Sequence, residues 1–222
     1  MRKDGKQALI LDFGGVISRT FFETHDASER ALGLAPGALT WRGPFDPASD
    51  PLWQAMQRDE ISERDYWLTR TRETGALLGE RWDKMADMVR RARGADPAAV
   101  IRPEAEAAID RAAAAGIRLA ILSNELDLFY GADFRKKLPL LDRFEAIVDA
   151  TYTGILKPDP RAYGLCLEAL DLPPAVCVFV DDQDRNVEGA RKDGLTAVAF
   201  DVLNPQDSFD RALAAFAPAQ DA

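Results

Sequence analysis

Five short apolar segments, each bounded by turn residues, constrain the fold of this chain more than any other feature. They are too short for helices and apolar at consecutive positions, which is typical of strands buried on both faces of a parallel sheet. We therefore predict strands at Ala8–Leu11, Ile117–Leu122, Ala146–Val148, Val176–Val180 and Ala197–Phe200.

Helical patterns separate these segments. The first begins with a proline in its first turn and ends before Gly116, as is common at helix boundaries. Strands that alternate with helices predict a doubly wound α/β sheet with helices on both faces. The predicted helices are Pro103–Ala115, Pro160–Leu170, Asn186–Lys192 and Ser208–Phe216.

The stretch from Ser18 to Asp96 interrupts this alternation. It carries no strand pattern, resembles several amphipathic helices, and contains all 4 tryptophans of the chain. A chain of 222 residues is long enough for one α/β core plus an inserted subdomain. We predict a core of residues 1–17 and 97–222 and a helical subdomain of residues 18–96, with Asp59 and Ser62 as N-cap candidates.

Composition and charge exclude several classes of protein. The net charge of −9 opposes binding to a nucleic-acid backbone. The apolar run near the N-terminus is interrupted by Asp12 and two glycines, and nothing approaches the roughly 20 apolar residues that span a bilayer. We therefore expect a cytoplasmic protein with neither a membrane nor a nucleic acid as partner.

The two cysteines, Cys166 and Cys177, lack the paired spacing of a zinc site and are too few for a disulfide scaffold. We expect both to pack as small apolar residues.

An aspartate ends the first predicted strand. In ALILDFGGVI, Asp12 follows the apolar run, and Gly14 and Gly15 come soon after it. Ligands of α/β folds bind at the carboxyl ends of strands, and glycines let the backbone approach an oxyanion or a metal closely. An aspartate after a strand is also a common turn former, so both interpretations stay open.

Two further segments place polar residues beyond strands. LAILSNE presents Ser123 and Asn124, where a hydroxyl and backbone N–H groups could hold a phosphoryl oxygen, although such a pair is also common in turns. GILKPDP presents Lys157 on a backbone stiffened by prolines. A lysine held there could neutralise both an acidic nucleophile and a phosphoryl group, or could simply lie on the surface.

Adjacent acids follow the fourth predicted strand. In VCVFVDDQDRNVEGARKDG, Asp181 and Asp182 end the strand, and Asn186 lies near the start of a helix. Hard oxygen ligands at a strand end suit Mg²⁺. If buried, two adjacent carboxylates need a cation or a lysine nearby. A solvated acidic loop is the alternative.

Together the four segments resemble the four motifs of the haloacid dehalogenase-like superfamily, in the same order and each at a strand end. The resemblance covers Ala8–Val16 and about Ala98–Phe200. It implies that Ser18–Asp96 is the helical cap that this superfamily inserts after its first motif.

The resemblance also implies a Mg²⁺-dependent phosphatase that hydrolyses a small phosphorylated metabolite through an aspartyl-phosphate intermediate. Neither the metabolite nor the oligomeric state is specified. The implied residues are the catalytic Asp12 and Lys157, with Asp12 as nucleophile, the metal ligands Asp12, Asp182 and the Gly14 backbone carbonyl, the phosphoryl-binding Ser123, Asn124 and Lys157, and the supporting Asp181 and Asn186.

One departure concerns proton transfer. Phosphatases of this superfamily usually have a second aspartate two residues after the nucleophile as general acid and base, whereas this chain has Gly14. Such assistance is typically worth about 10²–10⁴ in rate. Glu23, His25 and Glu125 are candidate substitutes.

Two other functions stay open. A 2-haloacid dehalogenase would use Asp12 without a metal, but those enzymes lack the paired acids seen at Asp181 and Asp182. A binding or regulatory protein that kept only the fold would have no need of these acids and Lys157. Arg19 and Arg42 are possible substrate contacts.

Overall fold

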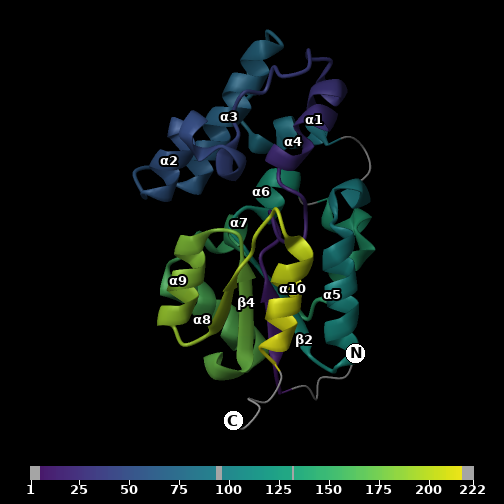
Figure 1. The fold of residues 1–222 in the computed structure, drawn as a ribbon, viewed down its shortest axis with the longest axis vertical. Coiled ribbons are helices and arrows are strands. Elements are labelled where there is room, and N and C mark those ends of the chain that lie inside the picture. The colour runs from purple at the N-terminus through teal and green to yellow at the C-terminus, as the bar shows by residue number, and fades with distance from the viewer. Residues whose placement is uncertain (1–5, 94–96, 132, 217–222) are drawn as a thin grey trace. The chain divides into compact units, whose positions relative to one another are not determined.

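The structure, a computed structural model, describes residues 6–93, 97–131 and 133–216. Its α/β part is built on a five-stranded parallel sheet with helices on both faces (Figure 1), which confirms the predicted fold class. The strand order is β3-β2-β1-β4-β5. The strands are β1 (Ala8–Leu11), β2 (Arg118–Ser123), β3 (Ala146–Asp149), β4 (Cys177–Asp181) and β5 (Thr196–Ala199).

The central strand β1 pairs with a parallel neighbour on each side. Leu11 is in register with Ile121 of β2 and with Val180 of β4. Parallel strands in register end at the same edge of a sheet. The polar residues that follow β1, β2 and β4 are therefore brought together at the carboxyl edge, where α/β folds bind ligands.

Helices cover the two faces of this sheet in pairs. Helices α8 and α9 pack against one face and α5 and α10 against the other (Figure 1). Side chains alternate between faces along a strand, so Ile10 and Phe179 join the apolar cluster with α8 and α9. The helices of this part are α5 (Pro103–Ala114), α7 (Ala150–Thr153), α8 (Pro160–Leu170), α9 (Asp184–Lys192) and α10 (Pro205–Ala214).

Both cysteines lie in this core, as predicted. Cys166 and Cys177 are free thiols in the same apolar cluster. Burial raises the pKa of Cys166 to about 12 and that of Cys177 to about 11. Both therefore stay protonated and pack as small apolar side chains.

The described residues divide into two compact units. The first is the α/β unit and comprises those within 1–19, 101–126 and 138–222; the second is helical and comprises those within 20–100 and 127–137. The segment 127–137 is thus grouped with the helical unit, although the sequence boundaries assigned it to the core. The helices there are α1 (His25–Leu32), α2 (Pro51–Gln57), α3 (Glu63–Leu77), α4 (Met85–Ala92) and most of α6 (Leu126–Tyr130).

The helical unit has its own apolar core, and all four tryptophans belong to it. Helix α3 begins with a capping box in which the Ser62 side chain accepts from the Asp65 backbone N–H. Ser62 is thus an N-cap, as predicted. The same prediction for Asp59 is wrong, because Asp59 takes the left-handed conformation at a φ of 58° and lies in the turn before α3.

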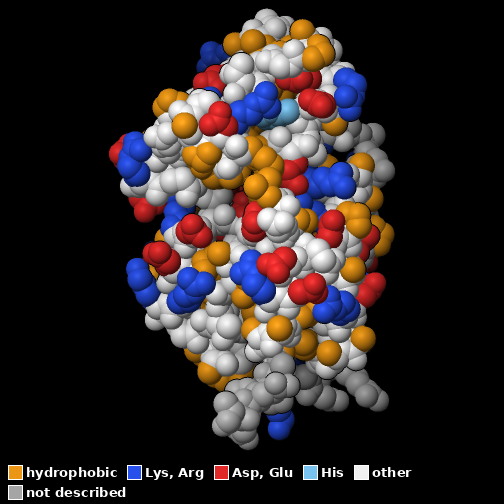
Figure 2. Space-filling model, viewed as in Figure 1, with side chains coloured by type: hydrophobic (Ala, Val, Ile, Leu, Met, Phe, Trp, Pro, Cys, Tyr) orange, Lys and Arg blue, Asp and Glu red, His pale blue; other side chains and the backbone are white. Residues whose placement is uncertain are grey.

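Surface charges are mixed in sign. On the face shown in Figure 2, Lys and Arg side chains lie interspersed with Asp and Glu. Exposed ion pairs such as Arg211 with Asp207 contribute about 0–1 kcal/mol each. Of the helices in the part of the chain that the structure describes, none is long and apolar enough to cross a bilayer.

Candidate active site

Asp12 stands at the carboxyl end of the central strand with its backbone and carboxylate both held. Its backbone N–H donates to the Val180 carbonyl at 2.9 Å, which extends the β1–β4 pairing by one residue. Its Oδ1 accepts from the Phe13 backbone N–H at 2.7 Å. The residue is buried, with 8% of its surface exposed. The carboxylate is thus fixed in place before any ligand arrives.

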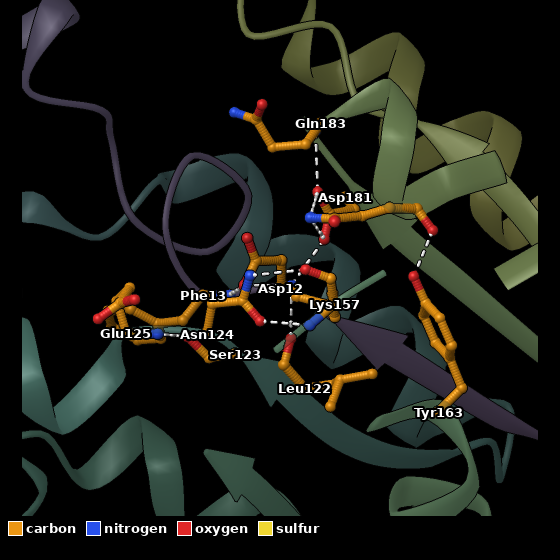
Figure 3. Close-up of polar contacts among 11 residues, drawn as sticks. Asp12, Phe13, Leu122, Ser123, Asn124, Glu125, Lys157, Tyr163, Asp181 and Gln183 are labelled. Atoms are coloured by element: carbon orange, nitrogen blue, oxygen red, sulfur yellow. Dashed lines mark hydrogen bonds and ion pairs between the residues drawn. The ribbon is translucent and has the colours of Figure 1, made fainter. Parts of the chain in front are cut away.

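Lys157 presents a buried ammonium to this carboxylate (Figure 3). Its Nζ lies 2.9 Å from Asp12 Oδ1 and donates to Asp181 Oδ2 at 2.7 Å and to the Leu122 carbonyl at 2.8 Å. Burial alone would lower the pKa of Lys157, but the two carboxylates outweigh burial and hold the pKa above its usual value. The lysine therefore stays charged at neutral pH.

Asp181 is fully buried, and donors surround its carboxylate. Oδ1 accepts from the Gln183 backbone N–H at 2.8 Å, and Oδ2 accepts from Lys157. The Asn186 side-chain amide lies 3.0 Å from Oδ1 and 3.1 Å from Oδ2. These contacts suit Asp181 to orienting Lys157.

Asn124 holds the backbone of Lys157 from both sides. Its Oδ1 accepts from the Lys157 N–H at 2.7 Å, and its Nδ2 donates to the Lys157 carbonyl at 3.3 Å. The sequence names Asn124 as a phosphoryl-binding residue at a turn, and this stays a prediction; its side-chain amide holds the lysine backbone. The neighbouring Ser123 is buried at the end of β2, and its Oγ accepts from the Glu125 backbone N–H at 3.4 Å.

The carboxylates at this edge fit a divalent cation. Asp12, Asp181 and Asp182 each offer one oxygen, and these three oxygens lie within 4.8 Å of one another. Carboxylates so close together repel one another, and a divalent cation would relieve that repulsion. Asn186 Oδ1 is also buried without a hydrogen-bond partner among the described residues, which suits a site completed by a hydrated ion. A carboxylate-rich site of this kind favours Mg²⁺.

The two glycines after Asp12 differ in their surroundings. Gly15 has a φ of +80°, and a Cβ there would lie 2.4 Å from Asp182 Oδ2, so only glycine lets this backbone pass so close to the carboxylate. Gly14 is exposed, and a Cβ there would have nothing within 4 Å. Close packing therefore explains Gly15 but does not explain Gly14.

Comparison with known proteins identifies the family. The family model of the haloacid dehalogenase-like hydrolases matches residues 6–194. The chain belongs to this family. Mouse acyl-CoA dehydrogenase family member 10 is 38% identical over 96 residues, which cover 42% of this chain and 9% of that protein. Phosphatase MT3486 of Mycobacterium tuberculosis is 33% identical over 99 residues, which cover 45% of this chain and 46% of that protein.

This chain matches less than half the length of each of these two relatives. Among solved structures, L-2-haloacid dehalogenase of Xanthobacter autotrophicus aligns with a TM-score of 0.59 at 24% identity, covering 96% of this chain and 85% of that one. At that identity the likeness concerns the fold alone.

The three candidate substitutes for the missing acid lie in different settings. Glu23, in the helical unit, accepts from the backbone N–H and the hydroxyl of Thr20 at 2.8 Å each. His25 Nδ1 lies 3.1 Å from the Arg42 guanidinium. Burial, and to a smaller extent the positive charge of Arg42, lowers the pKa of His25 to about 4. Glu125 is buried beside Ser123, and in Figure 3 its side chain points away from Asp12. None of these contacts favours proton transfer at Asp12.

Sequence reasoning missed two residues of this haloacid dehalogenase-like site. Tyr163 donates its hydroxyl to the Asn186 carbonyl at 2.7 Å. Arg102 is buried and donates its Nε to the Gly15 carbonyl at 3.1 Å. Of these two, only Arg102 could have been noticed in the sequence. It directly precedes Pro103 and helix α5, and a cation is unfavourable at a helix N-terminus because it opposes the helix dipole.

Proposed function

We propose that this chain is a Mg²⁺-dependent phosphatase that hydrolyses a small phosphorylated metabolite, with Asp12 as the nucleophile. The observation that carries the proposal is the cluster of Asp12, Asp181 and Asp182, whose oxygens lie within 4.8 Å, beside the buried ammonium of Lys157. The name of the mycobacterial relative supports the same activity.

Asp12 would begin the reaction. One carboxylate oxygen attacks the phosphorus in line with the departing alcohol oxygen, so that an O–P bond forms to Asp12 while the bond to the alcohol breaks. A water molecule then attacks this aspartyl phosphate, which releases inorganic phosphate and restores the carboxylate. The Phe13 N–H and Lys157 contacts keep the attacking carboxylate in one orientation.

Lys157 would act through its charge. Its raised pKa keeps the proton on Nζ, so it stabilises the negative charge of the phosphoryl group and does not donate a proton. The Ser123 hydroxyl at the end of β2 would bind a phosphoryl oxygen. Asn124 and Asp181 would hold the lysine in place from its backbone and its ammonium respectively.

The residues suited to hold Mg²⁺ are Asp12, Asp182 and the Gly14 backbone carbonyl. When bound, the ion would neutralise charge on the phosphoryl oxygens. Asp181 is less suited to bind it directly, because its two oxygens already accept from Lys157, Gln183 and Asn186. Asp181 and Asn186 would instead support the ligands and their waters.

The helical unit would select the substrate. We propose that residues 18–96 act as a cap, that residues 1–17 and 97–222 form the catalytic core, and that the protein works in the cytoplasm on a soluble metabolite. Tryptophan fluorescence can test the cap, because all four tryptophans belong to the helical unit. Addition of Mg²⁺ with a phosphate analogue should change this fluorescence if the cap responds to the occupied site.

The activity is tested by hydrolysis of p-nitrophenyl phosphate with Mg²⁺, with EDTA, and after Mg²⁺ is restored. We expect turnover only when Mg²⁺ is present. Halide release from 2-chloropropionate is measured in parallel without metal. Halide release with no phosphate release would establish the dehalogenase alternative, and the absence of both, across a panel of phosphorylated sugars, nucleotides and organic acids, would favour a binding protein.

A further inference from the structure

Arg102 is buried in the α/β unit although nothing in its local sequence requires an arginine. Only 2% of it is exposed, and it stands directly before α5, where a positive charge opposes the helix dipole. Its backbone N–H donates to the Ile17 carbonyl at 3.0 Å, and its guanidinium lies over the Phe200 ring at 5.5 Å. A burial this unfavourable points to a specific partner.

That partner is the turn that follows the nucleophile. Arg102 Nε donates to the Gly15 carbonyl across 87 positions of sequence, and Ser18 of the same turn forms a bridge with Ile101. The two strand-like ends, Ile17–Ser18 and Ile101–Arg102, are thus joined by backbone contacts, and the guanidinium reaches beyond them to Gly15.

Gly15 is a residue whose conformation needs such a support. Glycine populates positive and negative φ about equally, yet here φ is +80° and the Cα lies against the Asp182 carboxylate. A rotation of φ at Gly15 turns the peptide plane that joins it to Gly14. The direction of the Gly14 carbonyl therefore depends on how firmly Gly15 is held, and Arg102 bonds the Gly15 carbonyl on the other side of that residue.

We propose that Arg102 is a positioning residue for the metal site: by holding Gly15, its guanidinium aims the Gly14 carbonyl at the bound Mg²⁺. This inference rests on the proposed function, because it concerns the same ion. Groups that orient metal ligands typically contribute about 10- to 100-fold in metal affinity. Arginine suits the task because it stays charged and keeps a fixed donor geometry.

The test compares Mg²⁺ affinity by calorimetry in the wild-type protein, Arg102→Met, and Arg118→Met as a matched control. Arg118 is also a largely buried arginine of the α/β unit, but it begins β2 at the opposite edge of the sheet and pairs with Glu145 and the Leu170 carbonyl. We expect Arg102→Met to weaken Mg²⁺ binding about 10- to 100-fold. Arg118→Met should leave the affinity within about twofold of the wild-type value, because Arg118 is far from the metal site.

Kinetics separate positioning from a merely structural loss. In Arg102→Met the Mg²⁺ concentration for half-activation should rise in parallel with the dissociation constant, while kcat at saturating Mg²⁺ and KM for p-nitrophenyl phosphate change little. A folded Arg102→Met with wild-type Mg²⁺ affinity overturns the inference alone. A wild-type protein that binds no Mg²⁺ instead overturns the proposed function.

A measurement on the wild-type protein covers the case in which the variant does not fold. The Nε–H signal of each arginine is followed by NMR during a Mg²⁺ titration. Arg102 Nε–H should shift as the site fills, whereas Arg118 Nε–H should not. An Arg102 signal that stays fixed while Mg²⁺ binds contradicts the positioning role.

Discussion

Each unit contains buried carboxylates that pair with a buried cation, and the two groups differ in the partners of those carboxylates. In the helical unit, Asp50 accepts from the Trp53 and Gly43 backbone N–H groups, the Tyr66 hydroxyl and the Arg70 guanidinium. Burial alone would raise the pKa of Asp50, but these donors keep it below its usual value. Arg70 also pairs with the half-exposed Glu73 at 2.6 Å.

The site in the α/β unit is different. There Lys157 pairs with Asp12 and Asp181, and Asp182 offers a third carboxylate oxygen within 4.8 Å of theirs. Asn186 Oδ1 is buried with no partner among the residues described. A buried group left unsatisfied costs about 1–3 kcal/mol. The first network also holds a buried atom without a partner among the described residues, Arg70 Nε, so an unsatisfied atom does not separate the two. What separates them is that three carboxylate oxygens converge within 4.8 Å in the α/β unit, whereas one buried carboxylate is surrounded by donors in the helical unit. The convergence of several carboxylates on one point thus marks the candidate binding site better than burial does.

The largest expected effect is the loss of activity in Asp12→Asn. The amide is nearly isosteric but cannot attack phosphorus, so turnover of p-nitrophenyl phosphate should fall by about 10⁴-fold or more, as when other nucleophiles are removed. The midpoint of urea unfolding should change little, because Lys157 keeps its pair with Asp181 and the carboxylates of the cluster repel one another less. A folded Asp12→Asn protein that keeps most of its activity would refute the nucleophile assignment.

Removing the cation from each network sharpens the comparison. Lys157→Met and Arg70→Met each leave buried carboxylates unpaired, which costs about 3–5 kcal/mol of unfolding free energy. Lys157→Met should also lower kcat/KM by about 10²–10³, as when an oxyanion donor is lost. Arg70→Met should leave kcat/KM per folded molecule unchanged. Denaturant unfolding measures the stability of each variant, and kinetics normalised to the concentration of active sites measure kcat/KM. Equal activity losses in the two variants would contradict the distinction between a structural network and a catalytic site.

A third buried group, His25, should make stability depend on pH. Its folded pKa of about 4 lies below the usual 6.5, first because of burial and then because of Arg42. The unfolded chain therefore binds the proton more readily, and stability should decrease as pH falls from about 6.5 toward 4, by up to about 3 kcal/mol. His25→Gln lacks this proton. Urea unfolding of both proteins between pH 7 and 4.5 isolates the slope, and parallel curves would contradict the assignment.

The sequence predicts those parts of the fold that depend on local pattern. The apolar runs locate every strand of the sheet to within one residue of where it lies, because both faces of each strand are buried. Asp12 and Asp181 likewise follow from their places at strand ends, because parallel register brings the ends of β1 and β4 to one edge. Lys157 does not, because α7 (Ala150–Thr153) separates it from β3. Ser62 is recognisable as an N-cap from the acid three residues later.

Contacts between distant segments escape this kind of reasoning. The bond from Arg102 to Gly15 joins positions 87 apart and follows no periodicity. The two-sided hold of Asn124 on the Lys157 backbone depends on how two loops meet, so the sequence could name both residues but not their roles. For the same reason the grouping of residues 127–137 with the helical unit has no local signature.

The smallest expected effect concerns Gly14, the position that departs from the family's usual pattern. A Cβ there meets no atom within 4 Å and needs no left-handed backbone, whereas the neighbouring Gly15 excludes any Cβ. Packing of the Cβ therefore permits Gly14→Asp, which restores the aspartate that phosphatases of this family usually have at this position.

The choice of substrate decides whether the aspartate changes kcat/KM. An alkyl phosphate releases a basic alkoxide that benefits from a proton, while p-nitrophenolate leaves readily without one. Full general acid–base assistance raises the rate by a factor of about 10²–10⁴. An aspartate introduced without supporting contacts should raise the rate less, by about tenfold. Gly14→Asp should thus raise kcat/KM for the alkyl phosphate about tenfold and leave that for p-nitrophenyl phosphate within about twofold. Gly14→Asn has the same size without the acid and serves as the control. An equal gain in Gly14→Asn would mean that the side chain acts by shape, and no gain in Gly14→Asp would mean that another group already supplies the proton.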